Sequence, residues 1–435
     1  MAFKRFQLGL IHVAVAMTLV PINSTLNRVM IKELAISATL VAALASLPYL
    51  FSPLQVAIGS YSDRHPVLGY RRTPYILAGL ILCVTGVAVS PQVAFLISEN
   101  YLLGILAGMA AFGAWGMGYN LSSVSYLSLA SELSGERGRG KTIATMWFMM
   151  IVSIIMTAIL ISRMVDPYTP QAMMRAFELV GGLALILGLL GLIRLEPRVE
   201  SGAPSSTSET YGIHQMAAAI LGNPVARAFF VYLLLLLAAI LGQDVLLEPF
   251  GAEAFGMTVT ETTRITSLWG TFVLVALLIA GALESRLPKK VVAQAGNLVA
   301  LGGFVVILVS GFTRNLGVFY AGVILLGAGT GVSTVANLSL MFDLTMEGSV
   351  GLYIGAWGTS NAMSRLVGSM LGGAVRDGVA QVTGKALSGY LVVFAIEVAM
   401  LAVAASMLAR IDVSAFRKGA VDLSMGEKAA IAVEG

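Results

Sequence analysis

The stretch GYNLSSVSYLSLASELSGERGRG, residues 118–140, returns 211 residues later as GTGVSTVANLSLMFDLTMEGSVG, residues 329–351. Nine of the 23 aligned positions are identical, and Glu132 stands opposite Asp343. Each copy begins as an apolar segment rich in small residues and ends in a polar turn, which is typical of a membrane-spanning helix and the loop after it. Shared hydrophobicity alone does not produce so many identities, so the chain is predicted to be internally duplicated.

The composition around this repeat excludes a water-soluble globule. Of the 435 residues, 57% are apolar and only 11% are charged, whereas soluble domains carry about 25% charged residues. At about 20 residues per crossing there is room for roughly a dozen helices. A net charge of +4 gives no basic face for nucleic acid, and one cysteine with three scattered histidines offers neither a disulfide framework nor a metal cluster. We therefore predict an all-α polytopic membrane protein.

Twelve segments are long and apolar enough to cross a bilayer, and they form two sets of six. The first set lies near residues 7–31, 37–59, 74–97, 101–130, 143–165 and 172–194, and the second near 225–247, 264–284, 291–312, 316–342, 350–375 and 387–409. A polar stretch rich in Pro, Ser and Thr separates them. The predicted domains are an N-terminal bundle over 1–195, a linker over 196–223, a C-terminal bundle over 224–410 and a tail over 411–435.

The placement of basic residues predicts the orientation of the chain. Lysines and arginines gather at the N-terminus, in alternate loops, in the linker and in the tail. Such residues favour the cytoplasmic side of a membrane. We therefore expect both termini, the linker and the tail to be cytoplasmic.

The loop after the second predicted helix carries Gly59, Asp63, Arg64, Arg71 and Arg72. With a short insertion, it resembles the Gly-x-x-x-Asp-Arg-x-Gly-Arg-Arg loop of the major facilitator superfamily, which implies twelve transmembrane helices in 6+6 pseudo-symmetric bundles. These residues would form a gating latch, because a carboxylate can accept hydrogen bonds from a helix N-terminus and arginines can bind carboxylates or lipid phosphates. The simpler alternative is an ordinary basic loop without a latch.

Polar groups inside two predicted helices mark a candidate cavity or coupling site, because such groups are costly in a membrane. They are Asn23, Asn27 and Arg28 in the first helix and Gln243, Asp244 and Glu248 in the seventh. Two carboxylates four residues apart repel each other, so one should be protonated or salt-bridged, and Arg28 is the expected partner across the halves. The group would form an outer gate sensitive to protons, or only hydrated helix ends.

Three more residues are candidates for buried roles. Arg365 and Glu397 each lie about ten residues from the end of a predicted helix, roughly 15 Å deep, so we expect them to form a buried ion pair. His12 is a candidate pigment-binding residue, because a neutral imidazole can ligate the magnesium of a chlorophyll. A hydrogen bond to a neighbouring group is the simpler role for His12.

Five stretches resemble the bacteriochlorophyll delivery family, the PucC and LhaA light-harvesting assembly proteins, within the major facilitator superfamily. They are NRVMIKEL (27–34), SDRHPVLGYRRTPY (62–75), GQDVLLEPFGAEAFGMTVTETT (242–263), NLSLMFDLTMEG (337–348) and GLYIGAWGT (351–359). The resemblance implies an assembly factor for photosynthetic light-harvesting complexes in a bacterial inner membrane. It also implies (bacterio)chlorophyll as the bound cofactor, and lipid, antenna polypeptides and pigment-synthesis enzymes as partners.

The sequence leaves two functions open. One is a non-enzymatic assembly factor that binds or delivers pigment, antenna polypeptides or both. The other is a proton-coupled secondary transporter of an amphiphilic solute, with Asp244, Glu248 and Arg28 as coupling groups. A membrane enzyme is not expected, because the sequence has neither a ligand-spaced metal motif nor the aspartate-rich motif of a membrane prenyltransferase.

Overall fold

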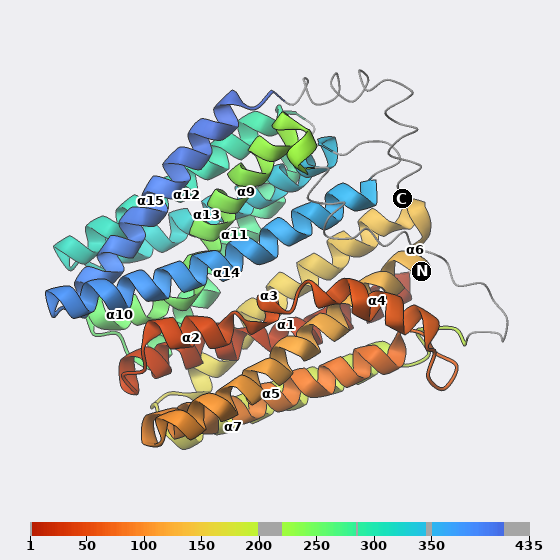
Figure 1. Cartoon of the computed structure of the whole chain (residues 1–435), viewed down its shortest axis with the longest axis horizontal. Coiled ribbons are helices and arrows are strands. Elements are labelled where there is room, and N and C mark those ends of the chain that lie inside the picture. The colour runs from red at the N-terminus through yellow and green to blue at the C-terminus, as the bar shows by residue number, and fades with distance from the viewer. Residues whose placement is uncertain (1, 199–219, 284–285, 345–349, 413–435) are drawn as a thin grey trace.

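The computed structural model describes residues 2–198, 220–283, 286–344 and 350–412. Figure 1 shows two helical bundles side by side, the N-terminal one in red to yellow and the C-terminal one in green to blue. We call the end at which α1 begins and α15 ends the terminal end, and the opposite one the far end. Most of the predicted linker and of the predicted tail lies outside the described residues.

Each bundle contains six crossings. The N-terminal bundle consists of α1 (Ala2–Met17), the π-helical segments η1 (Pro21–Leu26) and η2 (Val29–Glu33), α2 (Ala38–Ala45), α3 (Leu47–Leu50), α4 (Leu54–Arg64), α5 (Thr73–Glu99), α6 (Tyr101–Met164) and α7 (Pro170–Leu192). The C-terminal bundle consists of α9 (Pro224–Gly242), the 3-10 turn η3 (Gln243–Val245), α10 (Leu247–Phe255), α11 (Val259–Leu283), α12 (Lys289–Thr313), α13 (Leu316–Asp343), α14 (Val350–Thr383) and α15 (Ala386–Arg410).

Ten helical segments in the described part of the chain are long and apolar enough to cross a membrane. Two of them lie within α6, where Gly135 adopts a left-handed backbone with φ of 61° and separates Tyr101–Gly135 from Lys141–Met164. The other two crossings are the second one, α2 to α4, and the more polar α14. The predicted all-α fold of twelve transmembrane helices is confirmed.

Two crossings that were predicted as continuous are broken by proline. The second crossing divides into α2, α3 and α4, with Pro48 and Pro53 at the breaks. The seventh ends at Gly242 and continues as η3 and then α10, which contains Pro249. Proline lacks the N–H that an uninterrupted helix needs. Both breaks lie beside the other bundle, because η3 contacts α2 and η1.

The sequence duplication corresponds to a duplication in packing. A Cβ on Gly79 of α5 would lie 2.4 Å from Ser122 Oγ of α6, and a Cβ on Gly296 of α12 would lie 2.6 Å from the backbone nitrogen of Ser333 of α13. Ser122 and Ser333 are matched positions of the repeat. The same close approach of helices, possible only without a side chain on one of them, therefore occurs in both halves.

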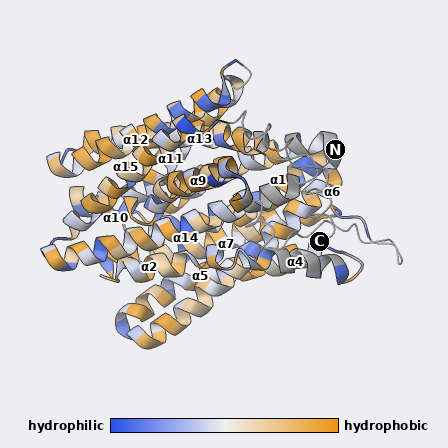
Figure 2. Ribbon diagram, turned by 45° about the horizontal axis from the view of Figure 1, so that its top comes forward, coloured by the Kyte–Doolittle hydropathy of each residue, from blue (hydrophilic) through white to orange (hydrophobic). Residues whose placement is uncertain are grey.

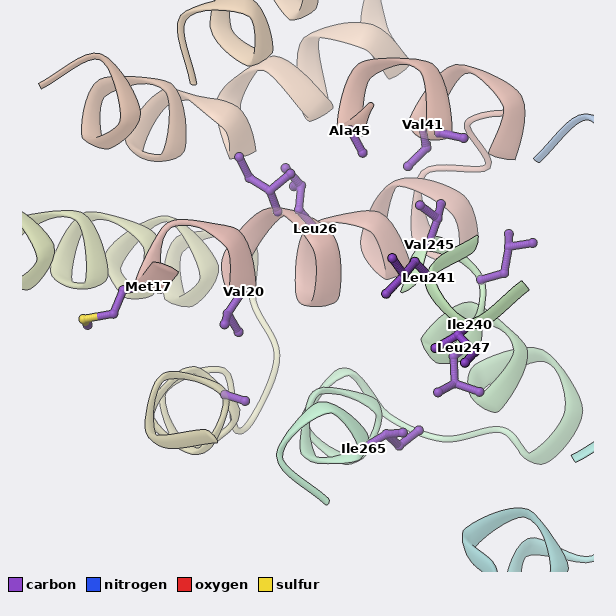
Figure 3. Close-up of a cluster of buried hydrophobic side chains, with 14 of the residues drawn as sticks. Met17, Val20, Leu26, Val41, Ala45, Ile240, Leu241, Val245, Leu247 and Ile265 are labelled. Carbon is purple, nitrogen blue, oxygen red and sulfur yellow. The ribbon is translucent and has the colours of Figure 1, made fainter. Parts of the chain in front are cut away.

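Apolar side chains hold the two bundles together and also cover the outside. Figure 2 shows hydrophobic residues along the lengths of the helices and hydrophilic ones mainly at their ends. In Figure 3, Val20 and Leu26 of the first crossing and Val41 of α2 gather with Val245 and Leu247 of the seventh. This core joins the halves at the same level as the helix breaks.

Candidate functional site

The candidate site lies where the broken first, second and seventh crossings meet α11 and α14. Its polar groups connect the two bundles around the far end, where α2 also packs on α14. In the first crossing, Pro21 begins the π-helical turn η1, which a second one, η2, follows. π-helical turns are rare and are frequently found at functional sites. They place Ser24, Thr25 and Arg28 against the C-terminal half.

Asp244 binds Arg365 at the break in the seventh crossing. The Arg365 Nη1 donates to Asp244 Oδ2 at 3.2 Å and to the Tyr49 hydroxyl of α3 at 3.3 Å, and the guanidinium lies 5.4 Å from the centre of the Tyr49 ring. Gln243 Nε2 donates to the second Asp244 oxygen at 3.1 Å. The Arg365 and Asp244 side chains are 29% and 25% exposed. The pair therefore lies within the C-terminal half, is joined to the N-terminal half by Tyr49 and is partly accessible.

The predicted ion pair between Arg365 and Glu397 is wrong. Arg365 is paired with Asp244 instead, and no described basic residue pairs with Glu397, which is 5% exposed on α15. The physical reason is the break after Gly242, since the 3-10 turn places Asp244 next to α14. The sequence predicts an unbroken seventh helix, and such a helix gives no reason to expect Asp244 as the partner of Arg365.

Glu248 lies in a second buried cluster that also joins the halves. Its Oε1 accepts hydrogen bonds from the hydroxyls of Ser24 in the N-terminal half and Thr266 of α11, the latter at 2.6 Å. The side chain is 3% exposed, and its Oε2 has no hydrogen-bond partner in the described part of the protein. Because the backbone break turns Asp244 toward Arg365, the two carboxylates do not share a partner.

Arg28 was expected to pair with one of these carboxylates, and this prediction is also wrong. Its guanidinium is bound by Glu33 of the same crossing and donates to the Met257 carbonyl of the other half at 3.1 Å. The π-helical turns bring Glu33 next to Arg28, a proximity that α-helical spacing does not predict. Outside the helices, burial raises the pKa of the nearby Tyr168 phenol, the Glu33 carboxylate raises it further, and Arg28 opposes the shift.

The two predicted asparagines lie close together, and their described contact joins the Asn27 side chain to the Asn23 backbone. Asn27 is buried, and its Nδ2 donates to the Asn23 carbonyl at 3.2 Å, while its Oδ1 has no described partner. Asn23 is half-buried. The predicted cavity or coupling residues thus divide between two centres, one around Asp244 and one around Glu248, and their coupling role remains a prediction.

Asp377 of α14 forms a clamp across the far end that the sequence did not suggest. Its carboxylate accepts hydrogen bonds from the backbone N–H groups of Ala38 and Thr39, at 3.1 and 2.8 Å, and from the Thr39 hydroxyl at 2.7 Å. These groups are the first turn of α2, where a negative charge is favoured by the helix dipole. Arg376 binds the same carboxylate at 2.8 Å. A second bridge joins Lys32 to Glu253.

The predicted latch residues make their described contacts within the N-terminal half. The backbone N–H groups of Arg71 and Arg72 both donate to Glu196, at 2.8 and 3.0 Å, and the Arg72 side chain donates to Ser62 and Glu132 at 2.8 and 3.0 Å. Thr73, at the start of α5, also donates to Glu196. The sequence predicts Glu196 as the first residue of the linker. In the structure its carboxylate instead holds this loop by accepting these hydrogen bonds.

The other predicted latch residues, Gly59, Asp63 and Arg64, have fewer described contacts than Arg71 and Arg72. A Cβ on Gly59 would lie 3.3 Å from Val124, so this glycine allows α4 to approach α6. Arg64 is exposed, and the Asp63 side chain lies outside what the structure describes. A gating role for this loop stays a prediction.

His12 does not fit a pigment in this conformation. The residue is 7% exposed, and its ring packs against Tyr126 and Trp147 with centroid distances of 5.3 and 6.3 Å. Its Nδ1 is buried without a hydrogen-bond partner. A tetrapyrrole needs an open approach to the imidazole, and the surrounding side chains occupy that space. Within the described residues, no group of three or more potential ligands could hold a metal ion.

The fold defines the class of protein. The structure resembles the nucleoside transporter NupG, with a TM-score of 0.71 at 15% identity, covering 94% of this chain and 98% of that one. It also resembles a D-xylose-proton symporter, with a TM-score of 0.70 at 13% identity and coverage of 93% and 97%. Likeness at this level of identity shows the fold alone, which is that of the major facilitator superfamily.

Sequence comparison then gives the family. The model of the PUCC protein family matches residues 25–416, and the chain belongs to this family. "Protein PucC" of Rhodobacter capsulatus is 30% identical over 422 residues, covering 92% of this chain and 90% of that protein. "Bacteriochlorophyll synthase 44.5 kDa chain" of the same organism is 28% identical over 381 residues, covering 86% and 87%. The predicted resemblance is confirmed.

Proposed function

We propose that this protein is a membrane assembly factor for photosynthetic light-harvesting complexes, which binds or delivers (bacterio)chlorophyll, antenna polypeptides or both. The observation that carries the proposal is the family match over residues 25–416, which includes the candidate site from Thr25 onward. The outer surface suits such a role, because exposed large apolar side chains such as Leu102, Leu106 and Ile186 give a broad lipid-facing area. Pigment or antenna helices would be met there rather than at His12.

The proposal includes a location and an orientation. The protein would reside in a bacterial inner, photosynthetic membrane with its terminal end in the cytoplasm, as the distribution of lysine and arginine favours. Antenna polypeptides and pigment-synthesis enzymes would be its partners, and it would perform no catalysis itself.

A second candidate function is proton-coupled secondary transport of an amphiphilic solute. The specific observation that favours it is the Asp244, Arg365 and Tyr49 centre, a partly exposed charge pair of the C-terminal half that binds a tyrosine of the N-terminal half in a transporter fold. Charged groups in such positions frequently mark substrate or ion pathways. Arg28 is bound to Glu33, so it would act on Glu248 only through the field of that pair.

Deletion of the gene in its photosynthetic host tests the leading proposal. We expect the antenna absorption bands of isolated membranes to fall, while a gene copy supplied in trans restores them. Purification in mild detergent should also retain pigment or small antenna polypeptides. Unchanged antenna bands, together with a colourless purified monomer that accumulates a solute in liposomes, would instead favour the transporter.

A further inference from the structure

Glu397 is a buried carboxyl group that none of the contacts above uses. It lies near the middle of α15, eleven residues after Ala386 and thirteen before Arg410, so it is about 16 Å from the start of the helix and about 20 Å from its end. The residue is 5% exposed, and its Oε2 is fully buried without a hydrogen-bond partner. A carboxyl group this deep in a membrane helix is rarely present without a role.

The basic residues on the helices around α15 are engaged elsewhere or lie at helix ends. On α14, Arg365 is bound to Asp244 and Arg376 to Asp377, and on α12 the Lys290 ammonium donates to two backbone carbonyls. The other described basic residues on the packed helices lie in a first or last turn: Arg227, Lys289 and Arg410. No described cation therefore compensates a negative charge at Glu397.

The remaining titratable groups near α15 are acids and tyrosines, each with its own partners. On α10, Glu248 is held by hydroxyl groups and Glu253 by Lys32. Tyr232 of α9 is hydrogen-bonded to Asn297 and Asn337 of α12 and α13, and Tyr390 of α15 itself lies under Arg376. Asp244 of η3 acts on Glu397 by opposing a second negative charge.

A small cavity adjoins the carboxyl group. It has a volume of about 10 Å³ and is lined by Glu397, Val393, Gly368, Gly372 and Ala238, from α15, α14 and α9. At its edge α14 and α9 approach closely, since a Cβ on Gly368 would lie 2.3 Å from the Ala238 carbonyl oxygen. Glu397 is the one polar side chain among the described residues of its lining, and a cavity of this size beside such a group is close to the minimum that holds one water molecule.

We propose that Glu397 is a proton-binding site inside the C-terminal bundle, occupied at neutral pH and hydrated by a single water molecule in the adjoining cavity. A carboxylate without a cation is much less stable in a water-poor interior than a neutral carboxyl group, which can also donate to the water. Because the Asp244 carboxylate disfavours a second negative charge, the proton occupancy of Glu397 should depend on the Asp244 and Arg365 pair. This proposal holds for an assembly factor and for a transporter alike.

Infrared spectroscopy of the purified full-length protein in lipid nanodiscs tests the site without an activity assay. We expect C=O stretching absorption of protonated carboxyl groups at pH 7, from which Glu397→Gln removes one component; the buried Glu248 can contribute another, which the variant leaves in place. The matched control is Glu99→Gln, because Glu99 is exposed to solvent at the far end of α5. This control should leave the absorption unchanged. A wild-type spectrum without this absorption, or absorption that Glu397→Gln leaves undiminished, would overturn the proposal.

Two further measurements keep the test decisive if Glu397→Gln does not fold. An apolar carbodiimide reacts with protonated carboxyl groups, so mass spectrometry of the wild-type protein treated at pH 7 should find the adduct on Glu397. In Asp244→Asn, which frees Arg365 and removes the opposing charge, the Glu397 component should disappear at a lower pH than in the wild type. Absence of the adduct contradicts proton binding, and an unchanged titration midpoint contradicts the dependence on Asp244.

Discussion

At the scale of single residues, the arginine on α14 shows how backbone geometry selects a partner. The sequence predicts Glu397 as the partner of Arg365, but the 3-10 turn after Gly242 brings Asp244 within 3.2 Å of its guanidinium. Tyr49 adds a hydrogen bond and a ring face to the same guanidinium. The Arg365 side chain therefore connects the second, seventh and eleventh crossings, and its contact with Tyr49 links the two halves.

The first prediction concerns this pair. Arg365→Gln should lower the free energy of unfolding by about 1 to 3 kcal/mol, because it leaves the Asp244 carboxylate without its charged donor. Asp244→Asn should cost a similar amount, and the double variant less than the sum of the two. Denaturant unfolding of the four proteins in the same detergent measures this coupling. Strictly additive losses would show that the two residues do not stabilise each other.

At the scale of elements, most of the fold could be predicted from the sequence, but several helix ends could not. Hydrophobic length located most of the crossings, since a membrane span needs a long apolar run; the broken second crossing and the more polar α14 have weaker signals. The start of α11 was missed by five residues, although Thr258 and Glu261 form a reciprocal capping pair that signals it. The end of α14 was missed by eight residues, where Gly384 with φ of 67° stops the helix. Both signals are local and lie outside the apolar run.

The candidate site was less predictable than the fold, for a physical reason. Sequence identified the right acids, Asp244 and Glu248, because charge in an apolar run is conspicuous. It gave wrong partners to Arg28 and Arg365, since pairing depends on π-helical and 3-10 turns that change the facing residues. Asp377 and Glu196 were missed because each lies near a helix end, where a charged residue is unremarkable until its backbone partners are known.

The second prediction tests the close contact between α9 and α14. Gly368→Ala should destabilise the protein by about 1 to 3 kcal/mol, because the new methyl group meets the Ala238 carbonyl and the helices must separate. Gly358→Ala on the same helix is the matched control, since nothing lies within 4 Å of a Cβ there. It should be neutral or stabilise by up to about 1 kcal/mol. Equal thermal unfolding midpoints for the two variants would refute the contact.

At the scale of the whole molecule, the described hydrogen bonds between the halves lie from the middle of the bundle to the far end. Thr25 meets Thr263 with 3.1 Å between hydroxyl oxygens, and Asp377 binds the first turn of α2. An assembly factor that presents its outer surface can keep this end shut. A transporter has to open it in every cycle.

The third prediction follows from that difference. Thr25→Cys combined with Thr263→Cys should form a disulfide on mild oxidation, because the two side chains already touch. We expect cells with the cross-linked protein to keep their antenna absorption bands, as do cells with either single variant. The native Cys83 is buried in the N-terminal half and should not interfere. Loss of the antenna bands that reductant reverses would show that the far end must open.

The π-helical turns of the first crossing also have a mechanical consequence. A π turn holds its hydrogen bonds over five residues instead of four, so η1 and η2 contain surplus chain within the span. Rewinding one such turn to ordinary α-helical pairing would rotate the rest of the crossing by about 100° per displaced residue. Ser24 and Arg28 would then swing away from Glu248 and Met257 together. Rewinding η1 or η2 would thus let the first crossing exchange one set of neighbouring residues for another without leaving the bilayer.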